Sequence, residues 1–298
     1  MNADTPAVVA DPRCHTGEGP LYHEEAGSVY WVDIPRGQLF RYDLITDDYE
    51  RILDVDGAIG GFTLQPDGDL LLFCDEGRIV PWNPDSGLGD PVVESVAGEA
   101  DSRFNDVVAD PHGRVYAGTM PADGRGGSLY RLDTDGTLAT VETGLAIPNG
   151  MGFTSDREAM YLTETDADRI YRYDYDEETG TLSDRAVFVD TADVEGKPDG
   201  LTVDAEGSVW SAFWDGGRLT RYAPDGSQAE RVPFPARKVS SVTFGGPDYE
   251  IAYVTTALGP GEGEPGTLED EGPGAGTLFA VDLEVTGVPE FRSRVALD

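Results

Sequence analysis

Lysine, histidine and cysteine are scarce in this chain of 298 residues. Only Lys197 and Lys238 are lysines among its 21 basic residues, and there are three histidines and two cysteines. Cys14 and Cys74 show no metal-binding spacing, so we expect two buried free thiols, with a disulfide between them as the alternative. A structural zinc site, which needs several cysteine or histidine ligands, is therefore excluded.

Long apolar runs and a leader peptide are also missing. No apolar stretch approaches the roughly 20 residues that a membrane-spanning helix needs. The N-terminus has neither the basic segment nor the apolar core of a signal peptide. These absences predict a soluble, cytoplasmic protein without a membrane partner.

Acidic residues, in contrast, are abundant. The chain has 57 Asp and Glu, and its net charge is −36. The acids are spread over the whole sequence and fall in turns such as Glu24-Glu25 and Asp47-Asp48. An acidic, lysine-poor surface predicts a halophilic protein, because counterions at high salt screen the repulsion; an ordinary acidic protein is the alternative. Without a basic face, nucleic acid is excluded as a partner.

Six repeats of similar length account for nearly the whole chain. Each contains two short alternating strands, which in the first repeat are Ser28–Asp33 and Gln38–Asp43. The equivalent residues Tyr30, Leu71, Tyr116, Tyr161, Trp210 and Tyr253 are 41, 45, 45, 49 and 43 residues apart. This period, built from strands and turns, is typical of propeller blades. We predict an all-β, six-bladed β-propeller with four antiparallel strands per blade, as one domain over residues 1–298.

Two features of the ring stay open at this level. The sixth repeat carries the insert Gly259–Gly276, whose Gly, Glu, Asp and Pro content predicts a mobile surface loop; a lid over the channel is the alternative. The ring closes either when Ala7–Ala10 pairs with the last blade or when Phe291–Leu297 completes that blade alone.

Oxygen-bearing side chains occur at one position of the repeat, just ahead of the inner strand. They are Glu18, Asn105, Asn149 and Asp199 in blades one, three, four and five, while blades two and six have Gly or Ser there. Inner strands begin near the central channel, so these groups should converge. Two carboxylates and two amides suit a divalent cation with several retained waters, such as Ca²⁺, Mg²⁺ or Mn²⁺. The alternative is that Asn-Gly and Asp-Gly only form turns.

The motifs around these residues resemble a known family. In order and spacing, the chain is similar to the senescence-marker protein / gluconolactonase / luciferin-regenerating-enzyme family, also called regucalcin-like. The resemblance covers essentially the whole chain and implies a six-bladed propeller that hydrolyses sugar lactones at one divalent metal. The matching motifs are Gly17–Pro20, Arg103–Asp106, Ile147–Gly150, Lys197–Leu201 and Val242–Gly246.

The resemblance also implies roles for single residues. Glu18, Asn149 and Asp199 would ligate the metal, Asp199 would act as the base, and Arg103 and Asn105 would hold the sugar hydroxyls. The metal itself stays open among Ca²⁺, Mg²⁺, Mn²⁺ and Zn²⁺. Animal-type members have an acidic residue soon after the Gly-Thr-Met that ends here at Met120. This chain continues with Pro121-Ala122, which leaves Asp123 as the candidate substitute.

Other polar and aromatic residues give weaker signals. His23 and His112 are expected in solvated turns, and His15 is expected to be structural, with a place at the channel rim as the alternative. Phe213 and Trp214 are expected to pack within a blade, with contact to the substrate as the alternative. No Gly-x-Ser-x-Gly motif occurs, which argues against a serine hydrolase.

Together these features predict a metal-dependent lactonase. Its substrate would be an aldonolactone, such as gluconolactone or a pentonolactone, opened to the aldonic acid in oxidative sugar degradation. A phosphotriesterase or arylesterase of the same fold and a non-catalytic calcium-binding propeller are the alternatives. Arg103 and Asn105 favour a lactonase that binds a polyol over both of these alternatives. The small-molecule lactone is the expected partner, and the protein is expected to be a monomer or a weak oligomer.

Overall fold

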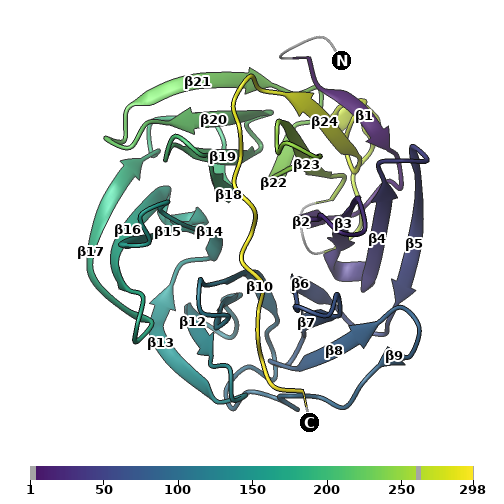
Figure 1. Cartoon of the computed structure of the whole chain (residues 1–298). Coiled ribbons are helices and arrows are strands. Elements are labelled where there is room, and N and C mark those ends of the chain that lie inside the picture. The colour runs from purple at the N-terminus through teal and green to yellow at the C-terminus, as the bar shows by residue number, and fades with distance from the viewer. Residues whose placement is uncertain (1–4, 260–262, 298) are drawn as a thin grey trace.

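Six four-stranded antiparallel sheets surround a central axis in the computed structural model of the chain (Figure 1). The structure describes residues 5–259 and 263–297. The prediction of a six-bladed propeller with four strands per blade is confirmed. Within the described residues, no helix is long and apolar enough to cross a membrane.

In blades one to five the four strands follow one another in chain order, from the channel outward (Figure 1). The two strands predicted in the first repeat, Ser28–Asp33 and Gln38–Asp43, have the predicted bounds. The blades contain, in order, β2 (Gly17–His23), β3 (Ser28–Asp33), β4 (Gln38–Asp43) and β5 (Asp48–Asp54); β6 (Ile59–Leu64), β7 (Leu70–Cys74), β8 (Ile79–Asn83) and β9 (Gly87–Leu88); β10 (Phe104–Ala109), β11 (Val115–Thr119), β12 (Gly127–Leu132) and β13 (Leu138–Leu145); β14 (Pro148–Phe153), β15 (Ala159–Glu164), β16 (Arg169–Asp176) and β17 (Thr181–Asp190); β18 (Lys197–Val203), β19 (Val209–Trp214), β20 (Arg218–Tyr222) and β21 (Gln228–Pro233).

The first strand of the chain closes the ring. β1 (Ala7–Ala10) pairs antiparallel with β24 (Leu278–Asp282), next to β23 (Ile251–Ala257) and β22 (Lys238–Gly245). Of the two closures considered, pairing by Ala7–Ala10 is confirmed. Completion of the sixth blade by Phe291–Leu297 is wrong, because β1 already occupies the outer edge of β24.

The residues after β24 instead cross the propeller. Figure 1 shows this segment passing over the centre, from the sixth blade towards blades two and three. The backbone amide of Ser293 donates to the carbonyl of Leu64 (2.9 Å), and that of Arg294 donates to the carbonyl of Gly113 (2.8 Å). We call residues 288–297 the C-terminal strap; it covers one end of the channel.

The core lies between neighbouring blades. Leu71, Tyr116 and Trp210, which mark the repeat, are fully buried, since a middle strand is covered on both faces. Both cysteines are buried free thiols, as expected. His112 is exposed in its turn, but His23 ends β2 with only 9% of its surface exposed, so its predicted solvation is wrong. Packing near the Tyr30 ring replaces solvent there.

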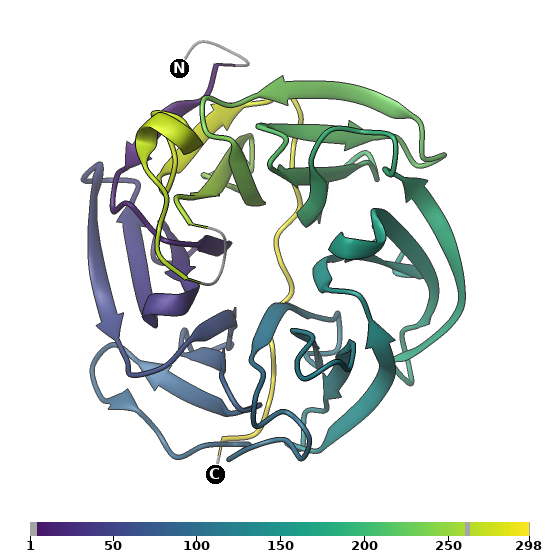
Figure 2. The same cartoon turned by 180° about the vertical axis from the view of Figure 1, so that it is seen from behind.

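The insert in blade six lies on the face opposite the strap, as Figure 2 shows. Residues 260–262 of the predicted loop lie outside the described residues. The remainder forms the short helix α1 (Leu268–Glu271), capped by Thr267, whose side chain accepts from the backbone amide of Asp270. The mobility of the insert stays a prediction.

Candidate functional site

A cavity of about 280 Å³ lies at the end of the channel away from the strap. Residues of η1 (Ile34–Arg36) and η2 (Thr165–Ala167) border it on the face seen in Figure 2. The structure brings together in this cavity the five residues predicted to bind the metal or the substrate: Glu18, Arg103, Asn105, Asn149 and Asp199. The repeat alignment therefore located this site from four separate segments of the sequence, and the resemblance added Arg103.

The four oxygen-bearing side chains lie inside the inner strands, at the second or third residue, rather than ahead of them. Pairing with the next strand shifts register at each of them: just after Glu18 in blade one, and across the segments that contain Asn105, Asn149 and Asp199 in blades three to five. Such a bulge bends the strand and redirects its side chains. The bulges thus point these groups towards the channel axis.

The glycines that follow Asn149 and Asp199 allow neighbouring inner strands to pack closely. A Cβ on Gly150 would lie 2.3 Å from the backbone nitrogen of Leu201, and one on Gly200 would lie 2.2 Å from Ser241 Oγ. Glycine is needed there because neighbouring inner strands approach closely around the channel.

Asn149 connects the blade-four and blade-five sides of the site. Its Nδ2 donates to Asp199 Oδ1 and to Thr165 Oγ1, and the Thr165 hydroxyl donates to the carbonyl of Pro198 (2.9 Å). The other amide atom, Asn149 Oδ1, is buried without a hydrogen-bond partner. A buried acceptor without a partner is costly, so this oxygen is suited to a bound ligand.

Two carboxylates of this site are almost completely buried. Glu18 is 5% exposed and Asp199 is 4% exposed. Burial, and then the negative charges of Asp199 and Asp106, raises the pKa of Glu18. Burial, followed by the charge of Asp106, likewise raises the pKa of Asp199, while Arg103 opposes both shifts. The site therefore holds negative charge that its own residues do not fully compensate.

Asp106 is the carboxylate whose part in the site the sequence did not reveal. Burial raises the pKa of Asp106 to about 7. It lines a smaller inner cavity of about 60 Å³, between the site and the strap residue Glu290. Regular alternation would place the side chains of Asn105 and Asp106 on opposite faces of the sheet. The register shift between Phe104 and Val107 breaks that alternation, so Asn105 and Asp106 both border the channel.

Arg103 and Asn105 form a polar wall of the main cavity. Arg103 Nη1 donates to Asn105 Oδ1 (2.8 Å) and to the carbonyl of Phe104 (2.9 Å). Asn105 Nδ2 donates to the carbonyl of Pro148 (3.1 Å) in the next blade. These bonds fix a permanently charged guanidinium and an amide beside the two carboxylates.

A family model now connects this geometry with known proteins. The SMP-30/Gluconolactonase/LRE-like model matches residues 16–258, which include all the site residues. The chain belongs to this family. Its match extends from β2 in the first blade to the end of β23 in the sixth.

Relatives in the SMP-30/gluconolactonase family are similar over nearly their whole length. Pentonolactonase XacC of Haloferax volcanii is 50% identical over 290 residues, covering 97% of this chain and 98% of the relative. Regucalcin of Bos taurus is 33% identical over 293 residues, covering 93% and 94%. Among solved structures, the calcium-binding protein regucalcin from Agrobacterium tumefaciens has a TM-score of 0.90 at 26% identity, covering 98% of both chains.

Within this SMP-30-family site, two candidates from the sequence do not reach the cavity. Asp123 is not among its lining residues. A hydrogen bond with the Asp101 carboxyl raises the pKa of Asp123 instead. His15 is buried behind the site against Gly259, and burial lowers its pKa. His15 is therefore buried within the fold, as expected for a structural residue.

The two aromatic candidates separate. Phe213 is fully buried, with the guanidinium of Arg218 3.9 Å from its ring centroid. Trp214 is half-buried and lines the cavity. Packing therefore accounts for Phe213, whereas Trp214 borders the cavity, and its contact with a substrate stays a prediction.

The donor set fits a divalent cation. Glu18 and Asp199 supply two carboxylates, and Asn149 Oδ1 supplies an oxygen that lacks a protein donor. Such hard oxygen ligands suit Ca²⁺, Mg²⁺ or Mn²⁺. In the described part of the chain, no three His, Cys, Asp or Glu side chains cluster as a metal site. A cation here would thus need the Asn149 amide in addition to the two carboxylates.

Proposed function

We propose that this SMP-30-family protein is a sugar lactonase that hydrolyses an aldonolactone, such as gluconolactone or a pentonolactone, to the aldonic acid. One observation carries the proposal: Glu18, Asn149 and Asp199 meet Arg103 and Asn105 in a single cavity. The relatives named pentonolactonase and 6-deoxy-6-sulfogluconolactonase, 50% and 33% identical, support it.

Glu18, Asn149 and Asp199 are proposed to hold one divalent cation, whose identity stays open among Ca²⁺, Mg²⁺, Mn²⁺ and Zn²⁺. When bound, such a cation polarises a carbonyl as a Lewis acid. The positive charge would also keep the Asp199 carboxylate ionised, against the effect of burial. The uncompensated carboxylates of the site support this assignment.

Asp199 is proposed as the general base. It accepts a proton from the attacking water, whose oxygen bonds to the carbonyl carbon. The ring C–O bond then breaks, and the ring oxygen takes that proton from Asp199 and leaves as a hydroxyl. Arg103 and Asn105 donate hydrogen bonds that orient the sugar hydroxyls. A lactone is already an activated ester, so no covalent nucleophile is needed.

The metabolic setting follows from the substrate. An aldonolactone arises when a sugar dehydrogenase oxidises an aldose, so the enzyme belongs in oxidative sugar degradation. A net charge of −36 with two lysines supports a cytoplasm rich in salt.

A lactone panel tests the proposed function. Purified protein in molar KCl should release acid from gluconolactone or xylonolactone faster than the spontaneous rate, measured by pH-stat titration. A chelator should abolish this activity, and one of several added divalent cations should restore it. Hydrolysis of paraoxon-type esters without turnover of any lactone would contradict the proposal and favour a phosphotriesterase.

Metal binding should also appear in thermal stability. Because the pKa values of Glu18 and Asp199 are raised in the fold, their ionisation destabilises the metal-free protein as pH rises from the unfolded value of about 4. At pH 8 a cation at a hundred times its dissociation constant should raise Tm by about 4 °C. Asp199→Asn should raise Tm without metal and reduce this response. An equal metal response in both proteins would place the cation elsewhere.

A further inference from the structure

Trp214 differs from the other tryptophans of the chain. Trp31, Trp82 and Trp210 are 1%, 5% and 0% exposed, whereas Trp214 is half-buried and lines the main cavity. It ends β19 directly opposite Lys197, two residues from Asp199 on the neighbouring strand β18. Its indole therefore forms an apolar wall close to the proposed reaction centre.

Lys238 holds this indole from outside the cavity. Its ammonium nitrogen lies 5.7 Å from the ring centroid of Trp214, and its side chain is only 6% exposed. The same nitrogen lies 2.9 Å from Asp215 Oδ1 and 2.6 Å from Glu271 Oε2. A buried ammonium paired with two carboxylates has little freedom to move, because leaving both would keep its own charge buried without a partner. All but two of the 21 basic residues are arginine, yet the residue beside the Trp214 ring is a lysine, whose ammonium is more compact than a guanidinium.

The insert of blade six completes the support. Glu271 ends α1, and its backbone carbonyl accepts from the amide of Arg237 (2.8 Å). Arg237 Nε also lies 3.2 Å from Asp215 Oδ1. The insert thus connects to the cavity through Glu271, Lys238 and Trp214. Its helix α1 therefore supports the position of the Trp214 indole.

We propose that Trp214 binds the substrate ring and that Lys238 and Glu271 position it. This inference rests on the proposed lactonase function and names the feature of the substrate that the site selects. A cyclic sugar presents a face of C–H groups that packs against an aromatic ring, while its hydroxyls meet Arg103 and Asn105. The open-chain aldonate has no such rigid face. The wall therefore favours the cyclic substrate over its product and assists product release.

Tryptophan fluorescence gives a test that needs no turnover. The probes are anhydroglucitol, a cyclic polyol without a lactone carbonyl, and glucitol, its open-chain counterpart. In molar KCl with Ca²⁺ or Mn²⁺, anhydroglucitol should change the emission and glucitol should do so at least about tenfold more weakly at equal concentration. The response should disappear in Trp214→Phe and persist in Trp82→Phe, which alters a buried tryptophan. A response that survives in Trp214→Phe, or equal responses to both polyols, would overturn the proposal.

Kinetics test the same wall with the active enzyme. Trp214→Leu should raise the KM for the lactone at least about tenfold and change kcat less than about threefold. Lys238→Met and the milder Glu271→Gln should raise KM in the same direction and shift the Trp214 emission. A KM within twofold of wild type for Trp214→Leu contradicts the wall while leaving lactonase activity intact. Conversely, a Trp214-dependent polyol response without turnover of any lactone would contradict the proposed function alone.

Discussion

Replacing Asp199 with asparagine should lower the rate of lactone hydrolysis by about 10²–10⁴-fold, the usual contribution of a positioned general base. The change keeps the size of the side chain and an oxygen that can accept from Asn149 Nδ2, so the inner strand should not move. It removes the group that accepts the proton of the attacking water. The measurement is kcat by pH-stat titration, with bound metal determined on the same samples.

A matched control uses another Asp-Gly pair of blade five. Asp225 precedes Gly226 in an exposed turn after β20, where it caps the backbone amide of Ser227. Asp225→Asn should keep the wild-type kcat. If Asp199→Asn retains the full rate with metal bound, Asp199 is not the base.

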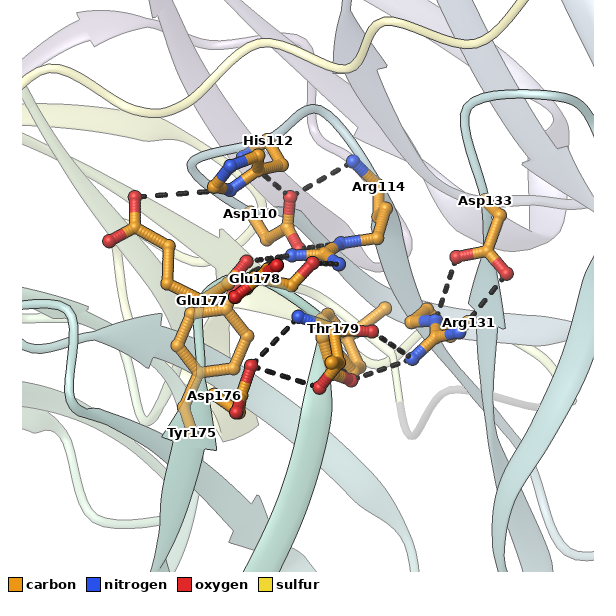
Figure 3. Close-up of polar contacts among 12 residues, drawn as sticks. Asp110, His112, Arg114, Arg131, Asp133, Tyr175, Asp176, Glu177, Glu178 and Thr179 are labelled. Atoms are coloured by element: carbon orange, nitrogen blue, oxygen red, sulfur yellow. Dashed lines mark hydrogen bonds and ion pairs between the residues drawn. The ribbon is translucent and has the colours of Figure 1, made fainter.

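Replacing Arg114 with methionine should lower the free energy of unfolding by about 3–5 kcal/mol, because it leaves a buried carboxylate without its partner. Figure 3 shows Arg114 between the Asp110 turn of blade three and the β16–β17 turn of blade four. Its Nε donates to Asp110 Oδ2 (2.5 Å), and its Nη2 donates to Tyr175 Oη (3.0 Å) and to the carbonyl of Glu177 (2.6 Å). Asp110 is fully buried, so solvent cannot replace the guanidinium.

The control for this variant is an exposed ion pair of blade four. Arg172 Nη1 lies 2.7 Å from Asp174 Oδ1, with both side chains largely exposed. Arg172→Met should cost about 0–1 kcal/mol. Denaturant unfolding followed by circular dichroism, at one fixed KCl concentration, compares the two variants. Equal losses would show that the buried connection between blades three and four does not contribute more than a surface pair.

The repeat made the fold and most of the site predictable. Strands that alternate with a period of 41 to 49 residues allow each blade to be superimposed on the next in sequence. Equivalent positions in a propeller lie at equal distances from the axis. Residues far apart in the chain, such as Glu18 and Asp199, could therefore be placed in one cavity without coordinates.

Asp106 and Trp214 were not assigned in this way, because their places depend on local departures from the repeat. A bulge in β10 brings Asp106 to the channel. Regular alternation would place its side chain on the opposite face of the sheet from that of Asn105. Trp214 reaches the cavity at the end of β19, and its support comes from Lys238 and from Glu271 in the insert. Composition marks the insert as irregular but does not say which residue it contacts.

The sequence by itself determined the number of blades, the family and the set of residues at the heads of the inner strands. Only the tertiary structure decided that β1 closes the ring, that the C-terminal strap covers the far end of the channel and that Asp106 adds a third carboxylate. The physical reason is the range of the interactions. Periodicity records the contacts that every blade repeats, whereas closure, strap and bulge arise from single contacts between segments that have no counterpart in the other repeats.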